Sequence, residues 1–412
     1  MMPSPQTPSH QRRKLLTTSL GLFAGGALGT LSRSALAQAA TVELPFANGK
    51  RTLVAYPEKR PLIVLTSRPP QLETPFEVFN EGIITPNDAF FVRYHNAGLP
   101  LSIDADKHVI KIGGNACGKP YELTMADLRT QFKPVEMVAV NQCSGNSRGL
   151  FNPRVTGGQL ANGAMGNARW VGVPLKDVLA RAELKNTARQ VTFDGLDIAL
   201  FGGGDFVKSL DVGHAMDGEV MLAYQMNGAD LPLLNGYPVR LIVPGYYGTY
   251  WVKHLSDIQV VDQTFEGFWM KPGYRIPDND CACVAPGTAS ANTRPIGRFN
   301  VRSFITSVSD GARLRAGQAT VVRGIAFDGG QGIREVAFSS DGGQSWRGAK
   351  LGADLGSYSF REFTFGFTPG AGEHDLRVRA WNRSGQSQPM DALWQPGGYM
   401  RNVVESVKVT AV

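Results

Sequence analysis

Cysteine is scarce in this 412-residue chain, which contains only Cys117, Cys143, Cys281 and Cys283. None of them lies in a Cys-x-x-Cys-His segment, so we expect no c-type haem on this chain. Their spacings fit neither a four-cysteine zinc site nor an iron–sulfur cluster. Two cysteines separated by one residue are awkwardly close for a local disulfide. We therefore expect Cys281 and Cys283 to be structural or incidental, and the role of Cys117 stays open.

Long apolar runs are also lacking. Residues 15–32 are uncharged but contain four glycines and several hydroxyl side chains, whereas a membrane anchor needs about 20 strongly apolar residues. Arg12 and Arg13 precede this stretch, and small-x-small cleavage sites follow it. The pattern resembles a twin-arginine export signal, with an ordinary secretion signal as the alternative. We expect residues 1–39 to be a signal peptide, the mature protein to be periplasmic, and no membrane span to remain.

A strong excess of one charge is absent once this leader is set aside. The chain has 42 basic and 35 acidic residues, a net charge of +7, and the first 39 residues contribute four basic and no acidic side chains. The remaining +3 is spread over the rest of the chain without a long run of either sign. This balance is not typical of a nucleic-acid-binding protein.

What is present up to residue 285 is a mixture of helix and strand patterns. The predicted elements are a helix over residues 174–182, a short helix after Thr124 with a capping box, and strands over residues 108–112 and 239–243. Gly202-Gly-Gly204 is not followed by a helical pattern, which excludes a dinucleotide-binding fingerprint there. We predict an α+β domain over residues 40–285 with long loops.

The composition changes after Cys283. Residues 286–296 are small, polar and proline-bearing, and we predict a linker. Beyond it, alternating strands are separated by turns, and Asp328-Gly-Gly and Asp341-Gly-Gly are typical of hairpins. About seven short strands predict an all-β, immunoglobulin-like sandwich over residues 297–412.

Cys143 follows a β-branched apolar run at residues 135–140 and begins a loop rich in Gly and Asn. This places the thiol at the end of a buried strand, where functional groups are often found. Arg148 adds a positive charge five residues later, and a cationic neighbour favours the thiolate, which suits a soft metal or a nucleophile. A buried, inert cysteine is the alternative.

The segment Asn-Gln-Cys-Ser-Gly-Asn-x-Arg at residues 141–148 resembles the molybdenum-ligand segment of the sulfite oxidase family. Four further segments resemble that family in the same order, at residues 90–95, 168–170, 236–245 and 267–275. The resemblance extends from about Leu44 to the C-terminus. It implies a molybdopterin-binding domain followed by an immunoglobulin-like dimerisation domain.

The resemblance also implies roles for individual residues. Cys143 would ligate molybdenum, Arg93 and Arg148 would bind the substrate anion, and Tyr274 would complete the catalytic set. The residues implied to bind the single Mo-molybdopterin are Phe91, Arg93, His95, Cys143, Asp197, Asn235, Arg240, Trp251 and Lys253. Taken alone, Arg93 and Arg148 are equally interpretable as surface or salt-bridge residues. An isolated His95 or Tyr274 would more often be structural.

Two departures from the family pattern concern the shape of the pocket. Asn235 stands where the vertebrate enzymes have histidine, and the tryptophan that they place before residues 168–170 is missing. Both departures favour the bacterial branch.

The implied function is oxidation of sulfite to sulfate in the periplasm, with electrons passed singly to a c-type cytochrome. That cytochrome would be a soluble acceptor or a haem-bearing partner subunit, and the chain itself would form a homodimer or a heterodimer. One alternative is the molybdenum subunit of a sulfane dehydrogenase in a thiosulfate-oxidising complex. Others are a related reductase of oxidised methionine and a non-catalytic binding protein on the same fold.

Overall fold

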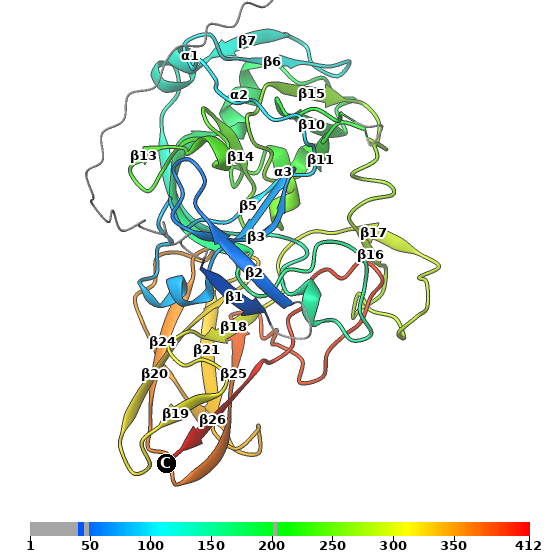
Figure 1. The fold of residues 1–412 in the computed structure, drawn as a ribbon. Helices are drawn as coiled ribbons and strands as arrows, with labels where there is room; N and C mark the ends of the chain where they lie inside the picture. The colour runs from blue at the N-terminus through cyan, green and yellow to red at the C-terminus, as the bar shows by residue number, and fades with distance from the viewer. Residues whose placement is uncertain (1–39, 45–48, 201–203) are drawn as a thin grey trace, which may run out of the picture. The chain divides into compact units, whose positions relative to one another are not determined.

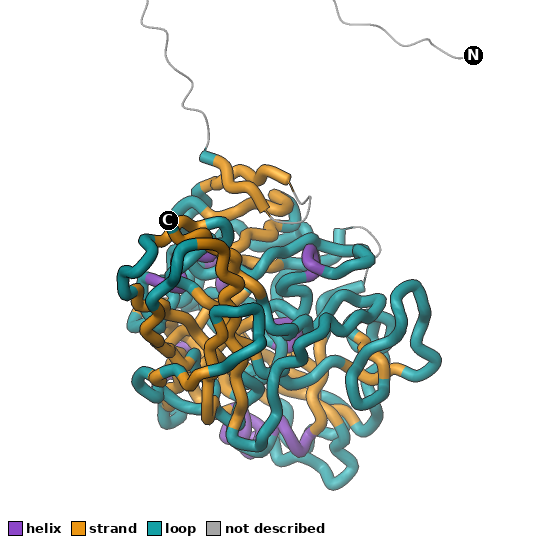
Figure 2. Tube along the Cα trace, turned by 90° about the horizontal axis from the view of Figure 1, so that it is seen from below, coloured by secondary structure: helices purple, strands orange, loops and turns teal. Residues whose placement is uncertain are grey.

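The computed structural model describes residues 40–44, 49–200 and 204–412 (Figure 1). The predicted signal peptide and Gly202 and Gly203 lie outside these residues. Strands and loops dominate the part described, and helices are few and short (Figure 2). Within the same part of the chain, no helix has the length and hydropathy to cross a membrane.

Three sheets and a two-stranded ribbon make up the first domain. In spatial order, one sheet contains β1 (Thr41–Leu44), β2 (Gly49–Val54), β3 (Leu62–Ser67), β4 (Pro70–Glu73) and β5 (Val92–Arg93). The second contains β11 (Lys208–Asp211), β10 (Gln190–Asp194), β15 (Asp257–Val261), β6 (Val109–Gly113) and β7 (Tyr121–Thr124). The third contains β13 (Ala229–Asp230), β12 (Met221–Met226), β9 (Met165–Pro174) and β8 (Val135–Gln142), with β14 (Arg240–Ile242) also paired to β12. The ribbon pairs β16 (Arg275–Pro277) with β17 (Thr293–Pro295), so the predicted linker contains a strand.

Two antiparallel-rich sheets form the predicted sandwich. One contains β18 (Arg302–Ile305), β20 (Thr320–Phe327), β24 (Arg361–Phe367) and β23 (Lys350–Leu351). The other contains β19 (Ala312–Leu314), β26 (Ser406–Ala411), β25 (Gly372–Asn382), β21 (Ile333–Ser339) and β22 (Arg347–Gly348). The two sheets together have nine strands where about seven were predicted, because β22 and β23 are two-residue strands with no signal of their own.

The helices are α1 (Met125–Thr130), α2 (Leu175–Arg181) and α3 (Val212–Ala215), with 3₁₀ turns η1 (Phe76–Asn80), η2 (Arg148–Leu150), η3 (Leu233–Asn235) and η4 (Gly248–Tyr250). The two predicted helices are confirmed. Thr124 and Asp127 form the capping box of α1. In α2, Leu175, Val178 and Leu179 are fully buried, which is the apolar face that the spacing predicted.

The strand that leads to Cys143 is also confirmed. β8 pairs with β9 over its whole length, and it is exposed at Val135 but buried from Val138 to Gln142. Its neighbour β9 carries Gly166, where an added Cβ would lie 2.5 Å from the Phe90 ring. Glycine is therefore needed at this position, because it lets Phe90 pack directly on the sheet.

The two predicted hairpin turns differ in outcome. Asp341-Gly-Gly joins the paired strands β21 and β22, so this hairpin is confirmed. Asp328-Gly-Gly joins β20 to β21, which belong to different sheets, so that prediction was wrong. The Asp328 carboxylate accepts hydrogen bonds from the backbone N–H groups of Gly330, Gln331 and Gly332. These bonds stabilise a loop that crosses between the sheets instead of a hairpin.

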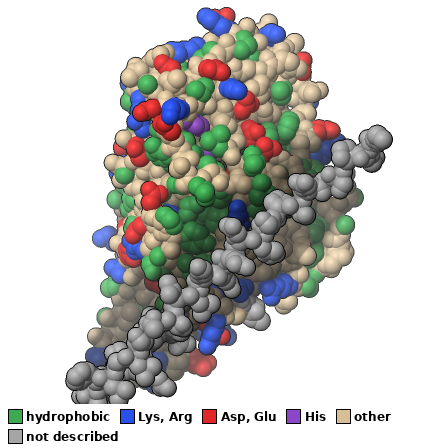
Figure 3. Space-filling model, turned by 45° about the horizontal axis from the view of Figure 1, so that its top comes forward, with side chains coloured by type: hydrophobic (Ala, Val, Ile, Leu, Met, Phe, Trp, Pro, Cys, Tyr) green, Lys and Arg blue, Asp and Glu red, His purple; other side chains and the backbone are tan. Residues whose placement is uncertain are grey.

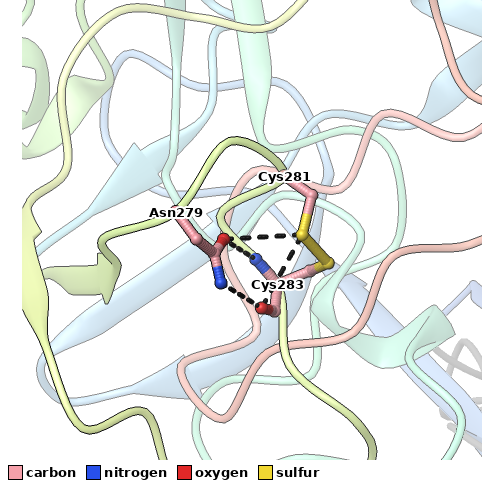
Figure 4. Close-up of a disulfide and its surroundings, with 3 residues drawn as sticks. All are labelled: Asn279, Cys281 and Cys283. Carbon is pink, nitrogen blue, oxygen red and sulfur yellow. Dashed lines mark hydrogen bonds between the residues drawn. A yellow bond between two sulfur atoms is a disulfide. The ribbon is translucent and has the colours of Figure 1, made fainter.

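Cys281 and Cys283 form a disulfide, which corrects the expectation that their spacing is too close (Figure 4). Ala282 between them has a φ of 47°, and the two Cα atoms lie 5.1 Å apart, within the usual range for a disulfide. Asn279 supports the loop, because its side chain accepts from the Cys283 N–H and donates to the Cys283 carbonyl. Cys117 and Cys143 are free and buried.

The sandwich has a hydrophobic core of its own and also contributes residues to the core of the first domain. Phe304, Phe327 and Phe360 belong to the same buried cluster as Phe79 of η1. Phe360 meets Phe79 edge-on at 6.0 Å between ring centroids.

On the face drawn in Figure 3, basic and acidic side chains are interspersed around apolar ones.

Replacing Phe360 by Ala should lower the free energy of unfolding by about 3–5 kcal/mol, the usual cost of removing a buried phenyl ring. Because the core is shared, both domains should lose protection against hydrogen exchange together. Val321→Ala is the control, since Val321 lies in β20 but is 66% exposed, and its effect should stay within about 0.5 kcal/mol. Loss of protection in the sandwich alone would contradict a shared core.

Candidate active site

A cavity lies beside Cys143, and segments distant in the sequence build its wall. Ten of the eleven predicted site residues line it. These are Phe91, Arg93, His95, Cys143, Asp197, Asn235, Arg240, Trp251, Lys253 and Tyr274. The exception is Arg148.

Cys143 is held by the loop that follows β8. Its backbone N–H donates to Ala164 (2.9 Å), and its carbonyl accepts from the N–H of Asn146 (3.0 Å). The Asn146 side chain in turn accepts from the backbone of Ala164 and donates to Asn162. The side chain of Cys143 is a free thiol and the residue is 8% exposed. A soft sulfur ligand is therefore fixed at the cavity wall by backbone hydrogen bonds.

The charges that line the cavity are unbalanced. Arg93, Arg240 and Lys253 are cationic, and Asp197 is the one carboxylate among the lining residues. Arg240 donates to the carbonyls of Asn235 (2.8 Å) and Trp251 (3.1 Å). Lys253 donates to the carbonyl of Arg93 (2.8 Å). Backbone carbonyls orient these side chains but do not neutralise them, so the cavity wall carries an excess of positive charge.

Burial is the main cause of the pKa shifts of these groups, and their mutual charges modify it. Burial lowers the pKa of Lys253 to about 7, and the neighbouring Arg240 lowers it further while Asp197 opposes the shift. Burial lowers the pKa of Arg240 to about 10. Burial also raises the pKa of Asp197, which Lys253 partly offsets. A bound anion would stabilise the protonated lysine and the arginines.

Several polar atoms in the wall are buried without a hydrogen-bond partner. They are Asn141 Oδ1, Ser144 Oγ, Arg240 Nε and Thr249 Oγ1. Buried polar groups are rarely left unsatisfied, because each costs desolvation energy without return. Together with the excess positive charge and the Cys143 thiol, these atoms fit a polar, anionic group that brings a metal with affinity for sulfur.

His95 and Tyr274 form a hydrogen-bonded pair in the same wall, between Nε2 and the phenol oxygen. Burial and the charge of Arg93 hold the pKa of His95 well below its usual value. Burial raises the pKa of Tyr274. The imidazole is therefore neutral and the phenol protonated. In the tautomer that carries its proton on Nε2, His95 donates to the phenol oxygen and leaves the Tyr274 O–H free to donate elsewhere. The backbone of Tyr274 has a φ of 58°, which is uncommon for a tyrosine and often accompanies function.

Arg148 is not among the residues that line the cavity. Its guanidinium donates to the carbonyls of Gly397 (3.3 Å) and Gly158 (3.4 Å). An added Cβ at Gly145 would lie 2.6 Å from its Cζ, which explains the glycine in this loop. The ring of Tyr399 lies 5.0 Å from the same guanidinium carbon.

Sequence analysis missed two residues next to the site. Tyr399, from a loop of the sandwich, stacks on Tyr274 with 5.4 Å between ring centroids. Lys208 lies 4.8 Å from the Tyr274 ring, and its ammonium donates to the Trp269 carbonyl (2.5 Å). No local pattern marks either residue, because both reach the site through tertiary packing.

Comparison with known proteins agrees with this architecture. Residues 96–269 match the model of an oxidoreductase molybdopterin binding domain. Residues 293–412 match the model of a Mo-co oxidoreductase dimerisation domain. These two matches confirm the predicted fold class.

Full-length relatives extend the similarity. The chain is 33% identical over 338 residues to sulfite oxidase of Gallus gallus, which covers 79% of this chain and 70% of that protein. It is 35% identical over 306 residues to the mitochondrial sulfite oxidase of Rattus norvegicus, covering 72% of this chain. The chain spans about half (54%) of the length of that rat protein.

A solved structure is similar as well. It is the sulfane dehydrogenase SoxCD from Paracoccus pantotrophus, with a TM-score of 0.72 and 27% identity, covering 86% of this chain and 87% of that one. Taken with the cavity around Cys143, these similarities show that the chain belongs to the sulfite oxidase family of molybdopterin oxidoreductases.

Proposed function

We propose that this chain oxidises sulfite to sulfate in the periplasm and passes the electrons singly to a c-type cytochrome. The observation that carries the proposal is the cavity that joins the Cys143 thiol to an unbalanced set of cations. A small sulfur oxyanion and an anionic molybdenum cofactor both suit such a cavity. The sulfite oxidases of other organisms support the choice of substrate.

The residues that would hold the cofactor follow from their chemistry. Cys143 would supply a thiolate ligand to the metal, since soft sulfur suits a redox-active ion. Arg240 and Lys253 would bind the phosphate of the cofactor, because fixed cations recognise phosphate oxygens. When bound, Mo-molybdopterin supplies the two-electron redox chemistry.

Residues of the chain itself would then bind and orient the substrate. Arg93 lines the cavity as a permanently charged guanidinium, which suits a small oxyanion. Tyr274 keeps its proton and can donate a hydrogen bond to an oxygen at the reaction centre. His95 holds the phenol in place through its neutral imidazole. Arg148 would be a second source of positive potential, since its guanidinium carbon lies 5.0 Å from the Tyr399 ring that stacks on Tyr274.

The proposed function also includes export, dimerisation and electron transfer to a cytochrome. The twin-arginine-like leader supports export, and a periplasmic protein meets c-type cytochromes and not the cytoplasmic NAD pool. The dimerisation domain at residues 293–412 supports a dimer. A haem-bearing subunit or a soluble cytochrome would accept the electrons.

A second candidate function is that of a sulfane dehydrogenase. Similarity to the sulfane dehydrogenase SoxCD covers most of both chains, which supports oxidation of a protein-bound sulfane sulfur. Turnover with free sulfite separates the two, because a sulfane dehydrogenase requires its sulfur-carrying partner. A binding protein without activity would contain no molybdenum or would not turn over.

The first test measures molybdenum content and sulfite-dependent reduction of cytochrome c on the purified protein. We expect molybdenum close to one per chain and no sulfite-dependent NADH. Cys143→Ser should abolish turnover, since a hard oxygen replaces the soft thiolate, while the circular dichroism spectrum stays unchanged. Cys117→Ser, a second buried thiol away from the cavity, should retain activity. Near-normal turnover in the Cys143 variant would contradict the ligand assignment.

A second test separates anion binding from chemistry. Arg93→Gln should raise the KM for sulfite about 10- to 100-fold, the loss of one charge-assisted hydrogen bond. Tyr274→Phe should lower kcat as well, because it removes the donor at the reaction centre. Arg169→Gln is the control, since Arg169 forms an exposed ion pair with Glu136. Unchanged sulfite kinetics in both site variants would refute their roles.

A third test uses pH. Lys253 has a pKa of about 7 without a bound anion, and an anion would raise it. Binding then takes up a proton above pH 7, so the affinity of the cofactor-free protein for sulfate should fall as pH rises from 7 to 9. Calorimetric titration with sulfate measures this slope. Lys253→Met should bind more weakly at pH 6 and show a smaller slope, with Arg93, Arg240 and Asp197 unchanged. An identical slope in the variant would exclude Lys253.

A further inference from the structure

Lys59 is a buried cation that neither family model includes, because the matches begin at residue 96. It lies between β2 and β3 and is 6% exposed. Its ammonium donates to the carbonyls of Asn87 (2.5 Å) and Phe90 (3.1 Å) and to Oδ1 of Asn235 (2.5 Å). All three donor positions of the ammonium are thus used, and every acceptor is neutral.

The acidic residues near Lys59 are engaged elsewhere. Glu58 accepts a hydrogen bond from the backbone N–H of Leu233 (2.9 Å). Asp88 forms a two-bond ion pair with the Arg60 guanidinium, with both contacts at 3.0 Å. Burial lowers the pKa of Lys59 to about 7, although Asp88 and Glu58 oppose the shift. A buried ammonium without a paired carboxylate costs stability, so a purely structural tie would be served better by a neutral donor.

The partners of Lys59 lead directly to the cavity. Asn235 uses its Nδ2 to donate to the carbonyl of Phe91 (3.1 Å), and its own carbonyl accepts from Arg240 (2.8 Å). Asn235, Phe91 and Arg240 all line the cavity. Lys59 therefore fixes the Asn235 side chain from behind, and Asn235 fixes the segment of Phe91 and the guanidinium of Arg240.

We infer that Lys59 is a positioning residue for the molybdenum cofactor, holding Asn235 and Arg240 and adding positive charge behind the wall that meets the cofactor's anionic group. This inference rests on the proposed function. It assigns a role to the N-terminal sheet, which precedes the region matched by the molybdopterin-binding model. It also explains why a lysine occupies this buried place.

The test measures how long the cofactor stays bound and needs no turnover. Full-length protein is diluted at fixed temperature, and loss of the pterin is followed by the fluorescence of the released, oxidised group. Lys59→Met should accelerate this loss at least tenfold. In an Asn235→Ala background, where Lys59 has lost its link to the wall, the same change should have a much smaller effect. Lys59→Arg, which keeps the charge, should restore part of the retention.

A control and a second measurement exclude a general loss of structure. Lys119→Met removes a lysine that pairs only at the surface with Glu183 and should retain the pterin like the wild type. The melting temperature of cofactor-free Lys59→Met reports the structural contribution separately. The inference would be overturned if Lys59→Met retained the pterin as long as the wild type does. It would also be overturned if Lys59→Met accelerated pterin loss as much in the Asn235→Ala background as in the wild type. The proposed function would stand in either case. A wild-type chain without pterin would overturn both.

Discussion

Positive charge buried without enough acid to neutralise it is the constraint on which the site depends. Arg93, Arg240 and Lys253 face one cavity with Asp197 as the only carboxylate in the lining, and Lys59 lies behind the wall. Charged groups removed from water are costly, so the fold must satisfy their donors with backbone carbonyls held at fixed positions. Those carbonyls come from β5, from a 3₁₀ turn and from loops that are far apart in the sequence, which ties the architecture of the domain to the chemistry of its cavity.

Prediction from the sequence succeeded where the information was local. The helix α2 and the strand β8 have clear apolar periodicity, and the loop at Cys143 has its own turn residues. The contacts of Lys59 could not be predicted in this way, because Asn235 lies 176 residues further along the chain. Tyr399 was missed for the same reason, since only the packing of the sandwich brings it onto Tyr274. Site residues that depend on such contacts carry no signal in the surrounding sequence.

Two errors show what turn chemistry alone cannot decide. Asp328 and Asp341 both precede two glycines, but only the second turn joins strands of the same sheet. The pairing of the flanking strands decides the outcome, and that pairing is set by the core of the sandwich. Cys281 and Cys283 can pair because Ala282 adopts a positive φ, which an alanine in the sequence does not predict. In each case the tertiary environment selects one of several local conformations.

The sandwich contributes to the site as well as to the core. The Met400 N–H donates to the carbonyl of Ser144 (3.2 Å), directly after Cys143, and the Gly397 carbonyl accepts from Arg148. Tyr399, between these two anchors, packs on Tyr274. Because the same domain also supplies Phe360 to the shared core, the loop cannot keep these contacts if the sandwich unfolds. The geometry around Cys143 and Arg148 is therefore a property of the two domains folded together, and a first domain isolated from the sandwich would lose it.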